Sequence, residues 1–199
     1  MSVDARLVSA LREQLARRPT HASRVGWKVG AGDRESIAGE LAVGNLTSAT
    51  LLEAGATYHG GGVDLRADAE IAVELGDGER IAGYGVALEL VDLGEGDDAE
   101  EVVAGNVFHR AVAFGAMHAE PPRGEGSLFV NGEPRAAAPV PDDVTERIAA
   151  IARLLESVGE RLQRGDRIIT GSVVQVPVQR GDDVVADVGE LGRVELFVA

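Results

Sequence analysis

The feature of this sequence that most constrains the fold is a strict alternation of side chains over residues 68–75. Acidic or small residues occupy the even positions, and the odd positions carry Ala69, Ile71, Val73 and Leu75. A period of two is typical of a half-buried β-strand. The turn signal Gly76-Asp77-Gly78 follows, and a second apolar segment covers residues 81–91. We therefore expect two neighbouring strands that pair with each other.

Asp68 and Glu70 lie on one face of the first predicted strand, because residues i and i+2 point to the same side. Two carboxylates about 7 Å apart along a strand repel each other unless a cation or water separates them. A solvated outer face would explain them, and Glu74 on the same face supports that interpretation. Glu89 favours a different one, because apolar residues flank it on both faces of the second predicted strand. A buried charge of this kind costs several kcal/mol unless it is paired.

A hairpin of the two strands would bring Glu89 close to Asp68 and Glu70. Three carboxylates in a site of low dielectric constant require a cation, and oxygen ligands without His or Cys suit Mg²⁺, Mn²⁺ or Ca²⁺ better than zinc. A 2-oxo acid could fill two open positions of such a metal through its carboxylate and keto oxygens. The metal would then polarise the carbonyl group and stabilise an enolate.

Lys28 is the single lysine among the 19 basic residues of the chain. It lies in the short apolar segment Gly26-Trp27-Lys28-Val29-Gly30, and a lysine titrates where an arginine does not. We predict that Lys28 is catalytic, either in proton transfer or in balancing the charge of the carboxylates. A lysine on the surface of a short strand is the alternative.

The segment Thr170-Gly171-Ser172 ends another predicted strand. Glycine allows close approach of the backbone to a ligand, and hydroxyl and N–H groups can hold a carboxylate, so we predict that these residues bind substrate. Such a tripeptide is also typical of an ordinary turn.

Hydrophobic periodicity predicts helices and strands that together form one α+β domain over residues 1–199. Helices are expected at 4–17, 98–117 and 143–158, with Asp143 and Glu146 as a capping box at the start of the last one. Residues 31–62 look rich in loops, and Asn131-Gly132 is typical of a hairpin turn. Further strands are expected at 25–29, 128–130, 167–170, 173–178, 183–188 and 193–198.

The composition of the chain argues against several classes of function. A net charge of −14 makes a nucleic acid an unsuitable partner, and an anionic substrate would need a local positive centre such as a metal ion or a buried lysine. The absence of cysteine excludes disulfides, thiolate nucleophiles and cysteine-ligated zinc. No apolar run approaches the roughly 20 residues of a membrane span, and the N-terminal residues do not resemble a secretory signal. We expect a cytoplasmic protein without membrane contact.

The same segments resemble a known family, in the same order along the chain. Gly26–Gly30 is similar to the G-[WYF]-K-[VI]-G signature of the 2-keto-4-pentenoate hydratase and 4-oxalocrotonate decarboxylase branch of the fumarylacetoacetate hydrolase superfamily. Residues 68–72 resemble the E-x-E-I-A metal-binding strand of that superfamily, with Asp in the first place. The resemblance runs from about residue 24 to 199, and the other matching segments are residues 83–92, 131–133, 162–172 and 191–194.

This resemblance implies a mixed β-sandwich or roll with peripheral helices. It implies Mg²⁺ or Mn²⁺ bound by Asp68, Glu70 and Glu89, a small 2-oxo acid as substrate, Asn106 near that substrate, and a homo-oligomer. The leading expectation is a lyase that hydrates a 2-hydroxydienoate. Decarboxylation of a 2-oxo diacid and C–C hydrolysis of an acylpyruvate are the alternatives, and the segment around Lys28 favours the first two reactions over hydrolysis.

Two further interpretations stay open. Val107, Phe108 and His109 stand where the family has small residues near the pocket, which is compatible with a non-catalytic relative that acts as a binding or assembly subunit. Association with a decarboxylase or hydratase partner would then be its role. The remaining interpretation is an acidic, strand-rich domain whose carboxylates belong to a solvated surface.

Overall fold

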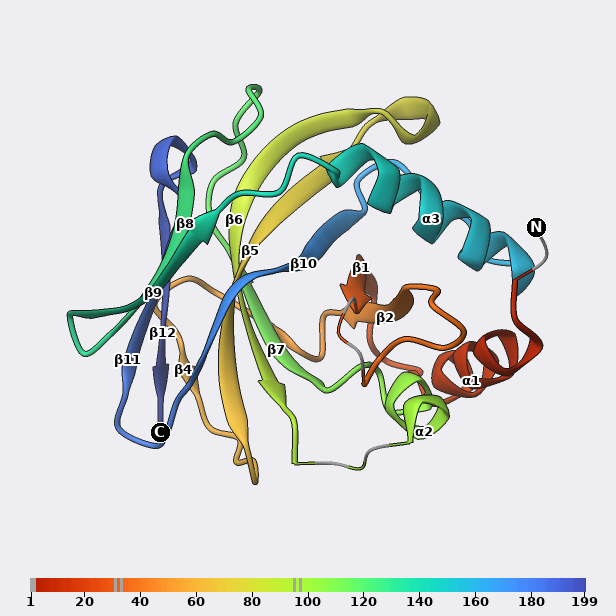
Figure 1. The fold of residues 1–199 in the computed structure, drawn as a ribbon, viewed down its shortest axis with the longest axis horizontal. Coiled ribbons are helices and arrows are strands. Elements are labelled where there is room, and N and C mark those ends of the chain that lie inside the picture. The colour runs from red at the N-terminus through yellow and green to blue at the C-terminus, as the bar shows by residue number, and fades with distance from the viewer. Residues whose placement is uncertain (1–2, 31, 33, 95, 97) are drawn as a thin grey trace.

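A computed structural model describes residues 3–30, 32, 34–94, 96 and 98–199 of this chain. Its largest element is a mixed seven-stranded sheet that curls into a half-barrel (Figure 1). The strands follow the spatial order β2-β1-β10-β5-β6-β7-β3. Their bounds are β1 Arg24–Gly30, β2 Ala42–Thr47, β3 Leu51–Leu52, β5 Leu65–Leu75, β6 Ile81–Asp92, β7 His109–Phe114 and β10 Arg167–Pro177.

A second sheet of five strands packs on one part of the first sheet (Figure 1). Its strands follow the order β4-β12-β11-β8-β9. Apolar residues from both sheets, such as Ile71, Leu88 and Leu128, form one buried core between them. The bounds are β4 Thr57–Tyr58, β8 Glu125–Val130, β9 Glu133–Pro139, β11 Asp183–Asp187 and β12 Arg193–Val198, and the short 3₁₀ turns are η1 Asp77–Glu79 and η2 Gly189–Leu191.

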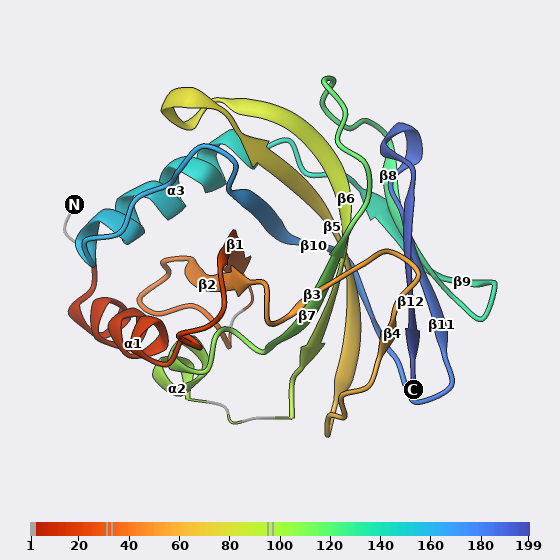
Figure 2. The same cartoon turned by 180° about the vertical axis from the view of Figure 1, so that it is seen from behind.

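Helices α1 (Ala5–Ala16), α2 (Ala99–Ala104) and α3 (Val144–Ser157) lie at the end of the half-barrel away from the second sheet (Figure 2). The apolar stripes of α1 and α3 pack with Trp27 and Ile168 of the curled sheet in a second core. No helix among the described residues is long and apolar enough to cross a membrane.

The two faces of β5 have different surroundings. Ala67, Ala69 and Ile71 point into the core between the sheets, and Val73 and Leu75 point into the core below the helices. The even-numbered residues therefore point to the opposite face, where Asp68, Glu70 and Ala72 are also buried. The strand is buried on both faces, not half-buried as the alternation predicts, because the curl of the sheet encloses the face that carries the carboxylates.

Most of the predicted elements are confirmed. The expected helices at 4–17 and 143–158 correspond to α1 and α3, and the hairpin of β8 and β9 turns at Asn131-Gly132. Strands β5 and β6 pair in antiparallel register, as expected for residues 68–75 and 81–91. The strands predicted at 167–170 and 173–178 form one continuous strand, β10, with two register shifts around Ser172.

Two further predictions are wrong. The helix predicted at 98–117 ends at Ala104, because Asn106, Val107 and Phe108 adopt left-handed backbone angles and the chain continues as β7. The segment 31–62 is rich in loops as expected, and it also contains the strands β2, β3 and β4, which the periodicity did not indicate. Asp143 does not cap α3 with its side chain, because its carboxylate instead accepts two contacts of 2.9 Å from Nε of Arg147.

Strand β1 passes close to β10 at Gly26, which pairs with Arg167. A Cβ atom added there would lie 1.8 Å from the carbonyl oxygen of Arg167. We expect Gly26→Ala to lower the free energy of unfolding by about 1–3 kcal/mol, as overpacking does, because the strand that carries Lys28 must move away from its neighbour. Urea unfolding followed by circular dichroism measures the change.

Gly61→Ala is the matched control, because an added Cβ at that position meets no heavy atom within 4 Å. We expect it to change the free energy of unfolding by less than about 0.5 kcal/mol. Equal effects of the two substitutions would contradict the close packing of β1 against β10.

Candidate metal centre

Three carboxylates meet on the enclosed face of the curled sheet. Asp68 and Glu70 come from β5, and Glu89 comes from β6 directly opposite Asp68 in the antiparallel register. Their relative exposures are 4%, 1% and 0%, so all three are buried. One oxygen from each lies within 4.8 Å of the others. The predicted convergence of these residues is therefore present in the structure.

The carboxylate oxygens are incompletely satisfied by the protein. Oδ1 of Asp68 and Oε2 of Glu89 have no hydrogen-bond partner among the described residues, although both are buried. Burial, with the nearby Glu89 charge second, raises the pKa of Asp68 to about 7. The same causes raise the pKa of Glu70 well above its ordinary value. Converging buried oxygens without donors are what a bound cation would satisfy.

Lys28 lies beside these carboxylates, as predicted. Its Nζ is 2.7 Å from Oε1 of Glu89 and donates a hydrogen bond of 2.9 Å to the carbonyl oxygen of Val107. Burial opposes the charge of Lys28, but the carboxylates around it outweigh that effect and raise its pKa. Burial likewise opposes the charge of Glu89, whereas Lys28 and His109 lower its pKa below the ordinary value.

The charges of this cluster do not balance. With all groups ionised, three carboxylates carry three negative charges and Lys28 carries one positive charge, which leaves two negative charges in a buried site. A divalent cation would neutralise that difference, and the donors are all carboxylate oxygens, the ligand type that Mg²⁺, Mn²⁺ and Ca²⁺ prefer. The residues present fit a hard divalent metal ion.

His109 belongs to the cluster, although the sequence shows no ligand spacing for it. Its Nδ1 is 2.7 Å from Oε1 of Glu89, and its Nε2 is 2.8 Å from Oγ1 of Thr50. Burial lowers the pKa of His109 against the effect of Glu89, so we describe the ring as neutral at pH 7. A register shift between β6 and β7 turns this side chain towards Glu89, and periodicity gives no signal of such a shift.

The predicted substrate-binding tripeptide lies beside the carboxylates, but its three residues make different contacts. The backbone N–H of Gly171 donates to Oε2 of Glu70 at 2.8 Å, and Ser172 lines the adjacent pocket. The hydroxyl of Thr170 is buried and donates to the backbone carbonyl of Ile71 at 3.1 Å. Thr170 thus joins β10 to β5, and substrate binding by this tripeptide stays a prediction.

Asn106 is placed at the turn after α2, where it joins two parts of the backbone. Its Oδ1 accepts from the N–H of Asn45 at 2.7 Å, and its Nδ2 donates to the carbonyl of the same residue at 3.0 Å. These contacts hold the turn against β2. A direct contact of Asn106 with substrate also stays a prediction.

A pocket of about 310 Å³ opens above the carboxylates. Besides the metal-binding candidates and Lys28, its walls include Glu35, Arg147, Ser172 and Gln175. Periodicity did not indicate Glu35, Arg147 or Gln175, because they come from a loop, a helix and a strand that only the tertiary structure brings together. The pocket combines buried anionic groups with polar side chains from several elements, as ligand sites do.

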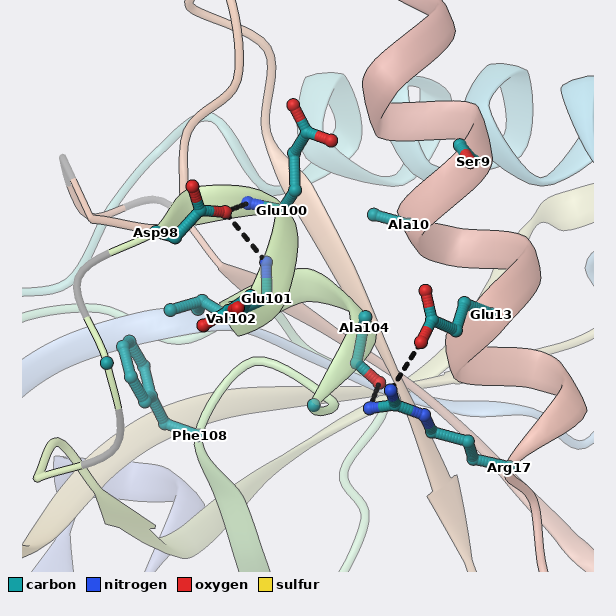
Figure 3. Close-up of a pocket in the computed structure, with 12 residues that line it drawn as sticks. Ser9, Ala10, Glu13, Arg17, Asp98, Glu100, Glu101, Val102, Ala104 and Phe108 are labelled. Carbon is teal, nitrogen blue, oxygen red and sulfur yellow. Dashed lines mark hydrogen bonds and ion pairs between the residues drawn. The ribbon is translucent and has the colours of Figure 1, made fainter.

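A larger hollow of about 720 Å³ lies between α1 and α2, and two of its acidic side chains have partners within the protein (Figure 3). Asp98 caps α2 by accepting from the backbone N–H groups of Glu100 and Glu101 at 2.9 and 3.1 Å. Glu13 pairs with Arg17 one helical turn away. Asp98 and Glu13 thus serve as a helix cap and as part of a surface ion pair.

No family profile and no curated protein matches this sequence. Solved structures do match its fold. 4-Oxalocrotonate decarboxylase from Pseudomonas putida G7, complexed with calcium and acetate, aligns with a TM-score of 0.79 and 23% identity, over 97% of this chain and 86% of that one. The same enzyme complexed with magnesium and adipate gives a TM-score of 0.79 and 22% identity, with the same shares of the two chains.

A more distant match is fumarylpyruvate hydrolase from Pseudomonas aeruginosa in complex with Mn²⁺ and pyruvate. It gives a TM-score of 0.62 and 16% identity, over 91% of this chain and 90% of that one. A fumarylacetoacetate hydrolase family protein from Yersinia pestis CO92 gives a TM-score of 0.61 and 21% identity. The alignment covers 90% of this chain and 94% of that one. The chain therefore has the fold of the fumarylacetoacetate hydrolase family, as the order of its sequence motifs predicts.

Proposed function

We propose that this protein is a lyase that acts on small 2-oxo acids with Mg²⁺ or Mn²⁺ held by Asp68, Glu70 and Glu89. The observation that carries the proposal is the buried group of three carboxylates, with two unpartnered oxygens and two uncompensated negative charges. Solved neighbours with this fold contain calcium, magnesium or Mn²⁺ together with small carboxylic acids, which supports the choice of metal and ligand class.

A bound divalent ion would supply Lewis-acid polarisation of the 2-oxo group. The protein's own residues set the conditions for that chemistry. Burial of Asp68, Glu70 and Glu89 keeps water from competing for the site and strengthens every charge interaction in it. Arg147 and Ser172 on the pocket wall are suited to bind and orient a carboxylate of the substrate.

Lys28 acts mainly in charge balance. Its raised pKa keeps the ammonium protonated at neutral pH, so it cannot serve as a general base there. Its contact with Glu89 keeps that residue in the carboxylate form, which is the form that binds a metal. Proton donation by Lys28 is compatible with its position, but it is less favoured because the carboxylates stabilise the proton.

Glu35 is the better candidate for proton transfer. It lines the same pocket, is half-buried, and accepts a hydrogen bond of 3.0 Å from the backbone N–H of Gly32. A general acid or base must come within hydrogen-bonding distance of the reacting group, and a pocket wall above the carboxylates is a suitable place. Its Oε2 is held by Gly32, so the position of the carboxyl group is defined.

Decarboxylation of a 2-oxo diacid and hydration of a 2-hydroxydienoate are the two candidate reactions. Both develop negative charge on the 2-oxo oxygen, which the same site can stabilise. The TM-score of 0.79 to 4-oxalocrotonate decarboxylase supports the first, and a hydrolase matches with only 0.62. The segment Gly26–Gly30 is compatible with hydration as well. A non-catalytic assembly subunit would keep the metal but turn over neither compound.

We expect Mn²⁺ to raise the melting temperature of the wild-type protein, since an ion that binds only the folded state stabilises it by about 2.7 kcal/mol at 100 times its Kd. Glu70→Gln should lose this rise. Without metal, the same variant should melt above the wild type, because it removes a carboxyl group whose ionisation is opposed by burial and by Glu89, while an amide oxygen can still accept from Gly171. Differential scanning calorimetry with and without Mn²⁺ measures both effects.

Glu74→Gln is the control, because Glu74 lies on the same strand but pairs with Arg167 at the sheet surface. It should keep the full Mn²⁺ response. A wild-type protein without any Mn²⁺ response, in the presence or absence of oxalate, would overturn the metal-dependent function.

We expect the Mn²⁺-loaded protein to release CO₂ from an unsaturated six-carbon 2-oxo diacid or to consume a 2-hydroxydienoate, as followed by its ultraviolet absorbance. Glu35→Gln should lower kcat by about 100-fold or more, the usual contribution of general acid–base catalysis, and leave the Mn²⁺ Kd unchanged. Mn²⁺ binding without turnover of either compound would identify a non-catalytic relative. An unchanged kcat in Glu35→Gln would exclude Glu35 as the proton-transfer group.

A further inference from the structure

His109 bridges two groups that lie on opposite sides of its ring. Nδ1 contacts Oε1 of Glu89 at 2.7 Å, and Nε2 contacts Oγ1 of Thr50 at 2.8 Å. The side chains of His109 and Glu89 are both 0% exposed. Because solvent does not reach this pair, each polar atom depends on the partner that the protein provides.

Two features of the backbone bring His109 to this position. The turn of Asn106, Val107 and Phe108 has positive φ angles of 73°, 56° and 62°. Strand β7 then pairs Ala111 with Leu90 but His109 with Val91, so that one extra residue bulges between them. A bulge of this kind changes the face to which a side chain points. Without it, His109 would follow Ala111 and Ala113 into the core between the sheets.

The partners define the tautomer of the ring. The carboxylate of Glu89 has only acceptor oxygens, so Nδ1 carries the hydrogen and donates it. Nε2 is then an acceptor, and the hydroxyl of Thr50 donates to it, because Nε2 at 2.8 Å is closer than the other acceptor of that hydroxyl, the carbonyl oxygen of Thr47 at 3.4 Å. The chain of donors thus runs from Thr50 through His109 to Glu89.

Two donors converge on the same oxygen of Glu89. Both Nδ1 of His109 and Nζ of Lys28 are 2.7 Å from Oε1, whereas Oε2 has no partner among the described residues. The ammonium of Lys28 lies at the end of a flexible side chain of four carbon atoms, whereas the ring of His109 is held at both nitrogens. The ring therefore adds to Lys28 a second, rigid contact that holds Oε1 of Glu89 in place.

We propose that His109 is a positioning residue of the metal centre, which holds Oε1 of Glu89 so that Oε2 is presented to the cation. The inference rests on the proposed metal-dependent function and adds a residue outside the ligand set. Hydrogen bonds to a metal-binding group from such residues commonly change metal affinity by about 10- to 100-fold.

The test is the Kd of Mn²⁺ for the full-length protein, measured from the electron paramagnetic resonance signal of free Mn²⁺. His109→Leu removes both contacts. His109→Asn keeps a donor at the δ position, and His109→Gln moves the amide towards Thr50 and away from Glu89. We expect a Kd about 10- to 100-fold weaker for the Leu and Gln variants, and a Kd within about threefold of wild type for the Asn variant.

His118→Leu is the control, because that histidine is exposed and, among the described residues, its hydrogen bonds come from its backbone. Its Kd should equal that of the wild type. Even if the Leu variant does not fold, the Mn²⁺ affinities of the Asn and Gln variants can be compared. Both amides are polar and uncharged, so the two variants differ in which contact of His109 they keep. Equal Mn²⁺ affinities of the Asn and Gln variants would overturn the positioning role while leaving the proposed function intact. Absence of Mn²⁺ binding by the wild type would overturn both.

Discussion

The antiparallel register of β5 and β6 is the constraint on which the rest of this structure depends. It sets Asp68 opposite Glu89 and places Glu70 two residues further along the same face. The same register sends Ala69 and Ile71 into the core between the sheets. A slip of one residue would exchange the two faces, burying carboxylates among apolar side chains. The core and the charged cluster therefore specify one pairing, and neither can change without the other.

Burial of three like charges requires compensation from other strands. β1 contributes Lys28 from the far side of β10, and β10 itself contributes the N–H of Gly171 to Glu70. Gly171 has a φ of 101°, and an added Cβ would lie 2.6 Å from the guanidinium of Arg147. A residue other than glycine would thus strain the backbone and displace the guanidinium of Arg147. Four strands of one sheet contribute to the cluster, yet the raised pKa values of Asp68 and Glu70 show that the protein alone does not fully compensate its charges, and two negative charges of the ionised form remain for a cation to balance.

The sequence predicted the strand pair and its carboxylates because each signal is local. Alternation over residues 68–75 and the isolated Glu89 are properties of two neighbouring segments. Lys28 was found through its rarity in the chain. The positions of His109, Arg147 and Gln175 beside the carboxylates were not predicted, because they result from a register shift, the packing of a helix and a distant strand. The prediction of a capping box at Asp143 was wrong, because its carboxylate accepts a hydrogen bond from Arg147 on the next turn of the helix.

The failed helix prediction at 98–117 shows how the site overrides local preference. Val103, Val107 and Ala111 repeat at helical spacing, yet the chain leaves the helix after Ala104. Left-handed angles at three successive residues cost on the order of 1–3 kcal/mol each, most clearly at the β-branched Val107.

What offsets that cost is visible in the contacts of the turn. The Asn106 amide bonds to Asn45, the side chain of Val107 is fully buried, and its carbonyl oxygen accepts from Lys28. Directly after the turn, His109 reaches Glu89. A continued helix would forfeit both contacts to the charged cluster and the pairing of β7 with β6. The strained turn persists because the tertiary structure, not the local sequence, supplies the free energy that holds it, as is common where local rules fail at functional sites.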